Sequence, residues 1–143
     1  MAGYCYGGTI NISSKPARAN PAPLALPDLT HPTPPPRSAV APKHVVDVFV
    51  SLHPGSLTAA QFEAVDVPHC LILADEDIGF DGIRAGALAI LERKKAEGLA
   101  VANYLHEGTV HGSYARPFLA DARIRKGFEE ATRQTGEWFS EHL

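Results

Sequence analysis

The segment Cys70-Leu71-Ile72-Leu73-Ala74, with Asp77 three residues beyond it, decides the fold class of this chain. Five consecutive apolar residues without alternation are typical of a strand that is covered on both faces, as in a parallel sheet. Similar strands are expected over residues 45–50, which are apolar except for Asp47, and over residues 99–105. Helical segments separate and follow these strands. This order predicts an α/β fold with a parallel sheet of about three or four strands flanked by helices.

Three helices are expected from capping signals and apolar spacing. A short one follows the capping-box pattern Thr58-x-x-Gln61 and ends before Pro68. A second spans residues 82–97, with Asp81 as its N-cap and Gly98 after its last turn. The last covers residues 121–142. Its apolar residues are expected to line one side: Ile124, Phe128, Ala131, Trp138 and Phe139.

The composition divides the chain into three parts. Residues 1–12 are rich in glycine, and residues 13–42 contain most of the twelve prolines, including Pro34-Pro35-Pro36. Proline lacks the amide donor and fixes φ, so the middle part is expected to be extended and disordered. Residues 43–143 carry the strand and helix signals and are expected to form the folded domain.

Composition and charge argue against several classes of function. With a net charge of −3 and the basic run Arg93-Lys94-Lys95 on the solvated face of a helix, no nucleic-acid partner is expected. No apolar run reaches the roughly 18–20 residues of a membrane-spanning helix, and the N-terminus does not resemble a signal peptide. Cys5 and Cys70 lie in unlike contexts and do not indicate a disulfide, so a reducing cytoplasmic location is expected. No metal or other cofactor is expected, because the acidic and histidine residues lack ligand spacing.

Three residues fall where α/β enzymes keep their reactive groups, in segments beyond the carboxyl ends of strands. Asp77 follows the strand that ends near Ala74, and His111 follows the strand that ends near residue 105. Cys5 is the centre of Gly3-Tyr-Cys-Tyr-Gly7, and flanking glycines suit the strained turn of a nucleophile elbow. The order nucleophile, acid, histidine is that of α/β-hydrolase triads.

Two other residues are given structural interpretations. Cys70, at the start of a buried strand, is interpreted as a core residue, and His53 before Pro54 as a turn residue.

These segments resemble motifs of the dienelactone hydrolase family, whose nucleophile is a cysteine. The resemblance extends over five separated segments in the family's order and covers residues 3–8 and most of residues 43–143. The matching segments are Gly3-Tyr-Cys-Tyr-Gly-Gly8, Val50-Ser-Leu-His-Pro-Gly55, Ala74-Asp-Glu-Asp-Ile-Gly-Phe80, Glu107-Gly-Thr-Val-His-Gly112 and Glu137-Trp-Phe-Ser-Glu-His-Leu143.

The resemblance implies a carboxylic ester or lactone hydrolase that acts on a small molecule through a thioester acyl-enzyme. Cys5 would be the nucleophile, Asp77 the acid and His111 the base. The backbone N–H of Tyr6 would serve the oxyanion hole, and Arg116 would meet a substrate carboxylate.

The fold would be an incomplete α/β-hydrolase fold, since the family has several strands before its nucleophile. We therefore expect a truncated polypeptide in which the strand that should carry Cys5 is absent. Asp75 and Ser113 also replace residues usual in the family, glutamate and phenylalanine.

Two other interpretations stay open at this point. The chain could be a non-catalytic remnant or interaction fragment of such a hydrolase. Alternatively, a partner or a second copy could supply the missing strands, because exposed edges of a parallel sheet favour self-association.

Overall fold

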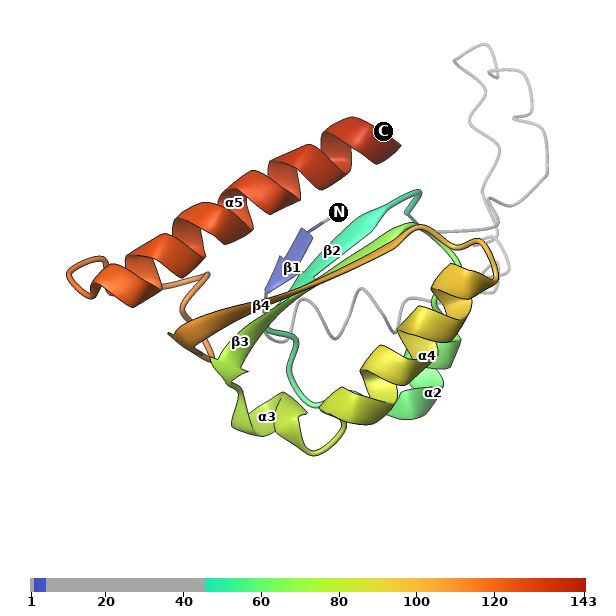
Figure 1. Ribbon diagram of the computed structural model, residues 1–143, viewed down its shortest axis with the longest axis horizontal. Helices are drawn as coiled ribbons and strands as arrows, with labels where there is room; N and C mark the ends of the chain where they lie inside the picture. Colours follow the sequence, from blue (N-terminus) through green and yellow to red (C-terminus); the bar gives the residue numbers. More distant parts are fainter. Residues whose placement is uncertain (1, 5–45) are drawn as a thin grey trace, which may run out of the picture.

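The computed structural model describes residues 2–4 and 46–143, with side chains from residue 46 onward. One parallel sheet contains four strands in the order β1-β2-β3-β4 (Figure 1). The strands are β1 (Ala2–Tyr4), β2 (Phe49–Leu52), β3 (His69–Glu76) and β4 (Val101–Val110). The predicted α/β class and parallel sheet are confirmed. The expected glycine-rich segment (residues 1–12) lies mostly outside the described residues, and the proline-rich segment (residues 13–42) lies wholly outside them.

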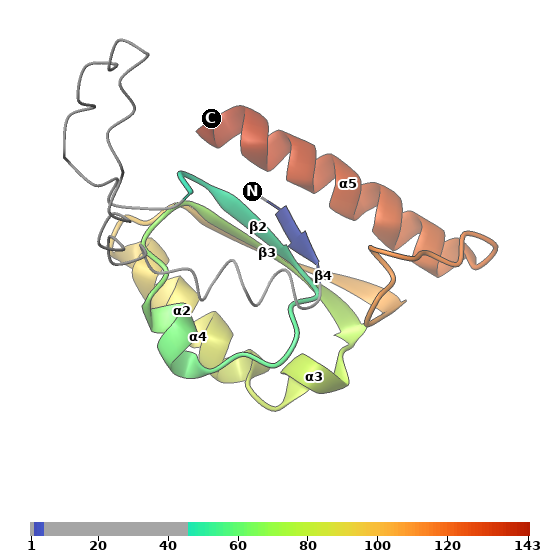
Figure 2. The same cartoon turned by 180° about the vertical axis from the view of Figure 1, so that it is seen from behind.

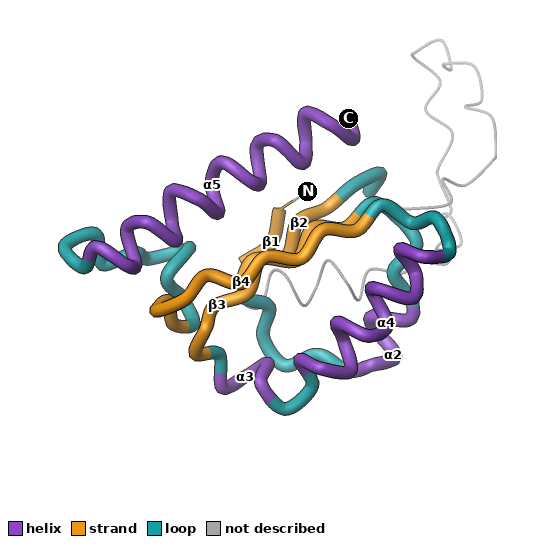
Figure 3. The backbone as a smooth tube through the Cα atoms, in the orientation of Figure 1, coloured by secondary structure: helices purple, strands orange, loops and turns teal. Residues whose placement is uncertain are grey.

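Helices cover both faces of the sheet. The helices are α2 (Ala59–Glu63), α3 (Ile78–Asp81), α4 (Arg84–Ala96) and α5 (Ala122–His142). The long helix α5 lies on one face, and α2 and α4 lie together on the other, as the two opposite views show (Figures 1 and 2). The tube in Figure 3 shows the same three layers, with the strands between the helices. This arrangement explains why β3 reads as a continuous apolar run.

Successive residues of β3 serve two separate cores because strand side chains alternate between faces. Leu71 and Leu73 pack with Phe62 and Leu91 under α2 and α4. Cys70, Ile72 and Ala74 face the other way, into a cluster with Ala131 and Trp138 of α5. Cys70 is therefore the core residue that the sequence predicted, and burial raises the pKa of its thiol to about 12.

Several expected boundaries need correction. The strand expected over residues 45–50 is observed at Phe49–Leu52, and the one expected to end at residue 105 continues to Val110. The helix expected from residue 82 begins at Arg84, because the separate turn α3 precedes it. Asp81 is consequently the last residue of α3 instead of an N-cap, and it forms an ion pair with Arg84. Gly98 does follow the helix, with φ of 101°, a conformation that favours glycine.

The expectation that no strand precedes Cys5 is wrong. Ala2, Gly3 and Tyr4 pair in parallel with Val50, Ser51 and Leu52. Three residues are too few to show an apolar pattern in the sequence, but β2 supplies the hydrogen-bonding partner that so short a strand needs.

Helix α5 matches the expected boundaries and is held close to β4. Asp121 caps its N-terminus by accepting hydrogen bonds from the N–H groups of Arg123 and Ile124. Gly127 lies against Thr109 of β4, where a Cβ atom would approach the Thr109 methyl carbon to 2.4 Å. Within the described part of the chain, no helix is both long and apolar enough to cross a membrane.

Candidate active site

Each candidate triad residue comes directly after the last residue of a parallel strand. His53, Asp77 and His111 directly follow the last residues of β2, β3 and β4. Cys5 directly follows Tyr4, the last residue of β1, but Cys5 itself lies outside the described residues. Because parallel strands end at the same edge of a sheet, the three described residues are gathered there.

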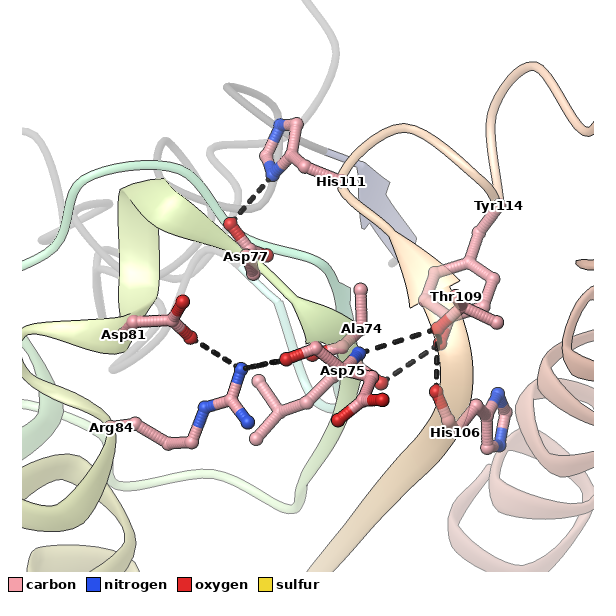
Figure 4. A network of polar contacts seen from close by, with 10 residues as sticks. Ala74, Asp75, Asp77, Asp81, Arg84, His106, Thr109, His111 and Tyr114 are labelled. Carbon is pink, nitrogen blue, oxygen red and sulfur yellow. Dashed lines mark hydrogen bonds and ion pairs between the residues drawn. The ribbon is translucent and has the colours of Figure 1, made fainter.

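Asp77 and His111 form the central contact of this edge (Figure 4). Oδ1 of Asp77 lies 2.8 Å from Nδ1 of His111. The Asp77 side chain is fully buried, whereas that of His111 is 38% exposed. A carboxylate that accepts from Nδ1–H selects the tautomer in which Nε2 is free of a proton, and Nε2 can then act as a base.

A widened register between β3 and β4 brings His111 level with Asp77. Ala74 pairs with His106, but Glu76 pairs with Val110, so β4 has two more residues than β3 over this stretch. Gly108, with φ of 71°, donates its N–H to Oδ2 of Asp75 at 3.0 Å, and the Thr109 hydroxyl donates to the carbonyl of His106 at 2.7 Å. Asp75 therefore secures the bulge, and this role did not follow from its sequence position.

The His111 backbone is fixed on both sides. Its N–H donates to the Glu76 carbonyl at 3.0 Å, which continues the ladder past the bulge. The chain then turns at Gly112, with φ of 94°, and the N–H of Val110 donates to the Ser113 hydroxyl at 3.0 Å. Ser113 thus closes the turn that presents His111.

Arg84 holds the segment that carries Asp77. Its Nη2 donates to the carbonyls of Ala74 and Asp75, each at 3.0 Å, and also pairs with Asp81 (Figure 4). On the other side, the Asp77 carbonyl accepts the N–H groups of Phe80 and Asp81, both at 2.8 Å. Sequence reasoning missed Arg84, since its contacts are with carbonyls that no motif specifies.

Burial dominates the electrostatics of Asp77. Loss of solvent raises the pKa of this carboxyl, and the His111 hydrogen bond acts in the opposite direction. Oδ2 of Asp77 is buried and has no hydrogen-bond partner among the described residues. The carboxylate therefore depends on its contact with His111, and a positive charge on that imidazole would be stabilised there.

His53 is a second residue that the sequence interpretation underrated. Its buried ring lies edge-on to His111, with ring centroids 4.8 Å apart, and stacks on Tyr114 at 5.2 Å. Its φ of 34° makes it the one non-glycine residue with positive φ in the described chain. The available signal was its position directly after a strand, where α/β proteins place reactive groups.

A cavity of about 520 Å³ opens beside His111. Its described lining comprises Gly55, Ser56, Glu76, Ile78, Gly79, Val110 and His111. Arg116, expected to meet a substrate carboxylate, is not part of that lining. It lies exposed in the turn after β4, where its N–H donates to the Gly112 carbonyl at 2.9 Å.

The structure thus brings Asp77 and His111 together and adds His53 to them. Tyr6, like Cys5, lies outside the described residues. In the part that is described, no three His, Cys, Asp or Glu side chains are arranged to hold a metal ion. Comparison with protein-family models and with curated proteins gives no match, so the resemblance depends on the quoted motifs alone.

Proposed function

We propose that this chain is a dienelactone hydrolase-like cysteine hydrolase of small carboxylic esters or lactones, with an incomplete α/β-hydrolase fold. Cys5 is the nucleophile, His111 the general base and Asp77 the acid that orients His111. One observation carries the proposal: the candidate triad residues follow strands that end at the same edge of the sheet. Asp77 and His111 are hydrogen-bonded at that edge, and β1 ends there one residue before Cys5.

The register of the sheet supports this assignment. Tyr4 pairs with Leu52, so β1 and β2 end side by side, and His53, which follows Leu52, contacts the His111 ring. The sequence order of the triad then agrees with the spatial order of the strands.

The reaction follows from these roles. His111 Nε2 takes the thiol proton, and the Cys5 thiolate attacks the acyl carbon. The tetrahedral intermediate expels the alkoxide, to which His111 returns the proton, and a thioester remains on Cys5. His111 next removes a proton from water, which attacks the thioester, and the carboxylic acid and free thiol are released. Asp77 accepts the Nδ1–H hydrogen bond throughout and stabilises the imidazolium.

Two further residues complete the proposal. The backbone N–H of Tyr6 is one donor to the oxyanion. Arg116, exposed outside the described lining of the cavity, pairs with a substrate carboxylate that extends beyond that lining. A cysteine nucleophile has to stay reduced, which favours the cytoplasm as its compartment. The reaction requires no metal or organic cofactor.

Hydrolysis of p-nitrophenyl acetate by the full chain tests the proposal. We expect turnover that is lost in Cys5→Ala and in His111→Asn, and an acetyl adduct on the peptide that contains Cys5. Cys70→Ala is the matched control because this second cysteine is buried away from the site and its variant should retain activity. Equal rates for the parent chain and Cys5→Ala would refute the proposed function.

An interaction fragment is the second candidate, and one observation favours it. Strand β4 is an edge strand of the described sheet, and Leu105 and Val110 on it are 50% and 42% exposed. Such an edge can pair with another copy of the chain. A rise in molar mass with concentration in light scattering, without Cys5-dependent hydrolysis, would favour this candidate.

A further inference from the structure

We propose that His53 is a positioning residue for His111: its buried ring packs against the His111 imidazole and keeps it turned toward Asp77. The inference deepens the proposed function and depends on it for its catalytic meaning. Its structural part concerns the orientation of His111 and can be tested without any activity.

The first support is the strain at His53. A φ of 34° in a residue with a Cβ atom is uncommon and strains the backbone. The same residue continues the sheet, because its N–H donates to the Ile72 carbonyl at 2.8 Å. The unusual φ therefore occurs at a point where the backbone is fixed by the sheet.

The second support is the fixed position of Tyr114, whose ring packs against that of His53. The Tyr114 ring stacks on His53 with an interplanar angle of 29°. The Tyr114 hydroxyl donates to the Leu73 carbonyl at 2.8 Å and lies 3.2 Å from the Thr109 hydroxyl. Tyr114 is thus tied to both β3 and β4, and its ring packs against that of His53.

His111 requires such a contact. The hydrogen bond from its Nδ1 to Asp77 fixes one point of the ring, and more than a third of the side chain is open to solvent. Rotation about χ1 and χ2 would break this hydrogen bond, which restrains the ring at Nδ1 only. The His53 ring meets it at an interplanar angle of 68°, which restricts that rotation.

The charge of His53 fits this role. Burial first, and the neighbouring His111 second, lower the pKa of His53 to about 4. His53 is consequently neutral at neutral pH and does not oppose a proton on His111. Among the described residues, the ionisable groups beside this pair are Asp77, which is bonded to His111, and Tyr114, which stacks on His53. Glu76 lines the same cavity as His111. Asp77 is itself influenced by Asp81 and Arg84.

Nuclear magnetic resonance of the full chain, labelled with ¹⁵N at histidine, tests the inference with two matched variants. His53→Asn tolerates positive φ but removes the ring, and His53→Phe restores a neutral ring of similar size. We expect His53→Asn to lose the preference of His111 for the Nδ1–H tautomer and its ring-proton contact to residue 53. We expect His53→Phe to recover the tautomer. Circular dichroism shows whether each variant is folded.

Activity and pH profile supply the catalytic readout. In His53→Asn we expect kcat to fall about tenfold with little change in KM, because misorientation affects the proton-transfer step. The dependence of kcat on pH should also change on its acidic side in His53→Asn. The variant His53→Phe should largely restore both kcat and its pH dependence.

Three outcomes would overturn the inference. One is a folded His53→Asn that keeps the His111 tautomer, kcat and pH profile. Another is a His53→Phe that is folded but as impaired as His53→Asn. If neither variant folds, the absence of a nuclear Overhauser effect between the His53 and His111 rings of the parent chain decides against it. Absent Cys5-dependent turnover in the parent refutes only the proposed function, since the tautomer measurement still tests the positioning.

Discussion

Oδ1 of Asp77 lies 2.8 Å from Nδ1 of His111, although 34 positions separate the two residues in the chain. The contact combines a fully buried carboxylate with an imidazole side chain that is 38% exposed, and it exists because β4 reaches past β3 through its bulge. It is the structural basis for assigning a proton-transfer role to His111.

Replacing Asp77 with asparagine should lower the activity without lowering the stability of the fold. The amide has a similar shape, but its carbonyl or NH₂ group cannot stabilise the imidazolium, so kcat should fall by about 10³–10⁴. Because burial raises the pKa of Asp77, removal of its charge should leave the free energy of unfolding unchanged or higher. Ester hydrolysis and urea unfolding measure the two effects. Asp47→Asn, at an exposed residue before β2, is the control, and equal kcat in Asp77→Asn and the parent would contradict the role of Asp77.

Arg84 should matter more for stability than its surface-like sequence context indicates. Arg84→Met removes the donors to the Ala74 and Asp75 carbonyls and should cost about 1–3 kcal/mol of unfolding free energy. Amide exchange of Phe80 and Asp81, which donate to the Asp77 carbonyl, should accelerate.

Arg93→Met is the matched control for Arg84. Arg93 lies on the same helix, but it pairs with Glu63 and Glu97 at the exposed surface, so its loss should lower the free energy of unfolding less than the loss of Arg84 does. Equal losses in the two variants would show that the carbonyl contacts of Arg84 do not hold the segment of Asp77.

Gly127 should not accept a side chain while Thr109 keeps its methyl group. The Cβ atom of alanine would lie 2.4 Å from Cγ2 of Thr109, so Gly127→Ala should lower the free energy of unfolding by about 1–3 kcal/mol. Thr109→Ser removes that methyl carbon and retains the hydroxyl that bonds to the His106 carbonyl. The double variant should recover most of the loss.

Gly136→Ala tests the alternative that only the backbone entropy of helix α5 is involved. Beyond the helix's own backbone, no atom of the described residues lies within 4 Å of a Cβ at this position, so the substitution should stabilise the chain by up to about 1 kcal/mol. Additive effects of Gly127→Ala and Thr109→Ser in urea unfolding would contradict the steric explanation.

Local patterns in the sequence predicted the layers of the fold but not its long-range details. The apolar run of β3 predicted a strand covered on both faces, and Asp121 marked the start of α5 correctly. The bulge in β4 escaped prediction, because it depends on Asp75 contacting Gly108 across 33 positions. The strand β1 escaped it as well, since its three residues acquire strand geometry only by pairing with β2.

The same difference between local patterns and long-range contacts applies to the candidate site. Its residue types and order followed from the sequence, whereas the contact of His53 with His111 required the register of three strands. The catalytic roles of Asp77 and His111 stay predictions, although their hydrogen bond is observed.

Acid should destabilise the chain partly through His69, which lies on the first residue of β3 and is fully buried. Its Nε2 lies 3.1 Å from the Ser51 hydroxyl, and burial lowers the pKa of its imidazole to about 3. In the unfolded chain a histidine titrates near 6.5. Between these two values the unfolded state binds one more proton than the native state, so the free energy of unfolding decreases as the pH falls through this window.

The variant His69→Gln isolates this contribution, because its amide can still bond to Ser51 but does not titrate. Urea unfolding from pH 8 to pH 4 should show a slope that is smaller than in the parent by up to about 1.4 kcal/mol per pH unit. The difference between the two chains at pH 8, where His69 is neutral in both states, measures the packing cost alone. His53, with its pKa near 4, adds a similar slope to both chains and cancels in the comparison. Parallel profiles for parent and variant would mean that His69 takes up its proton in the folded chain as readily as in the unfolded one.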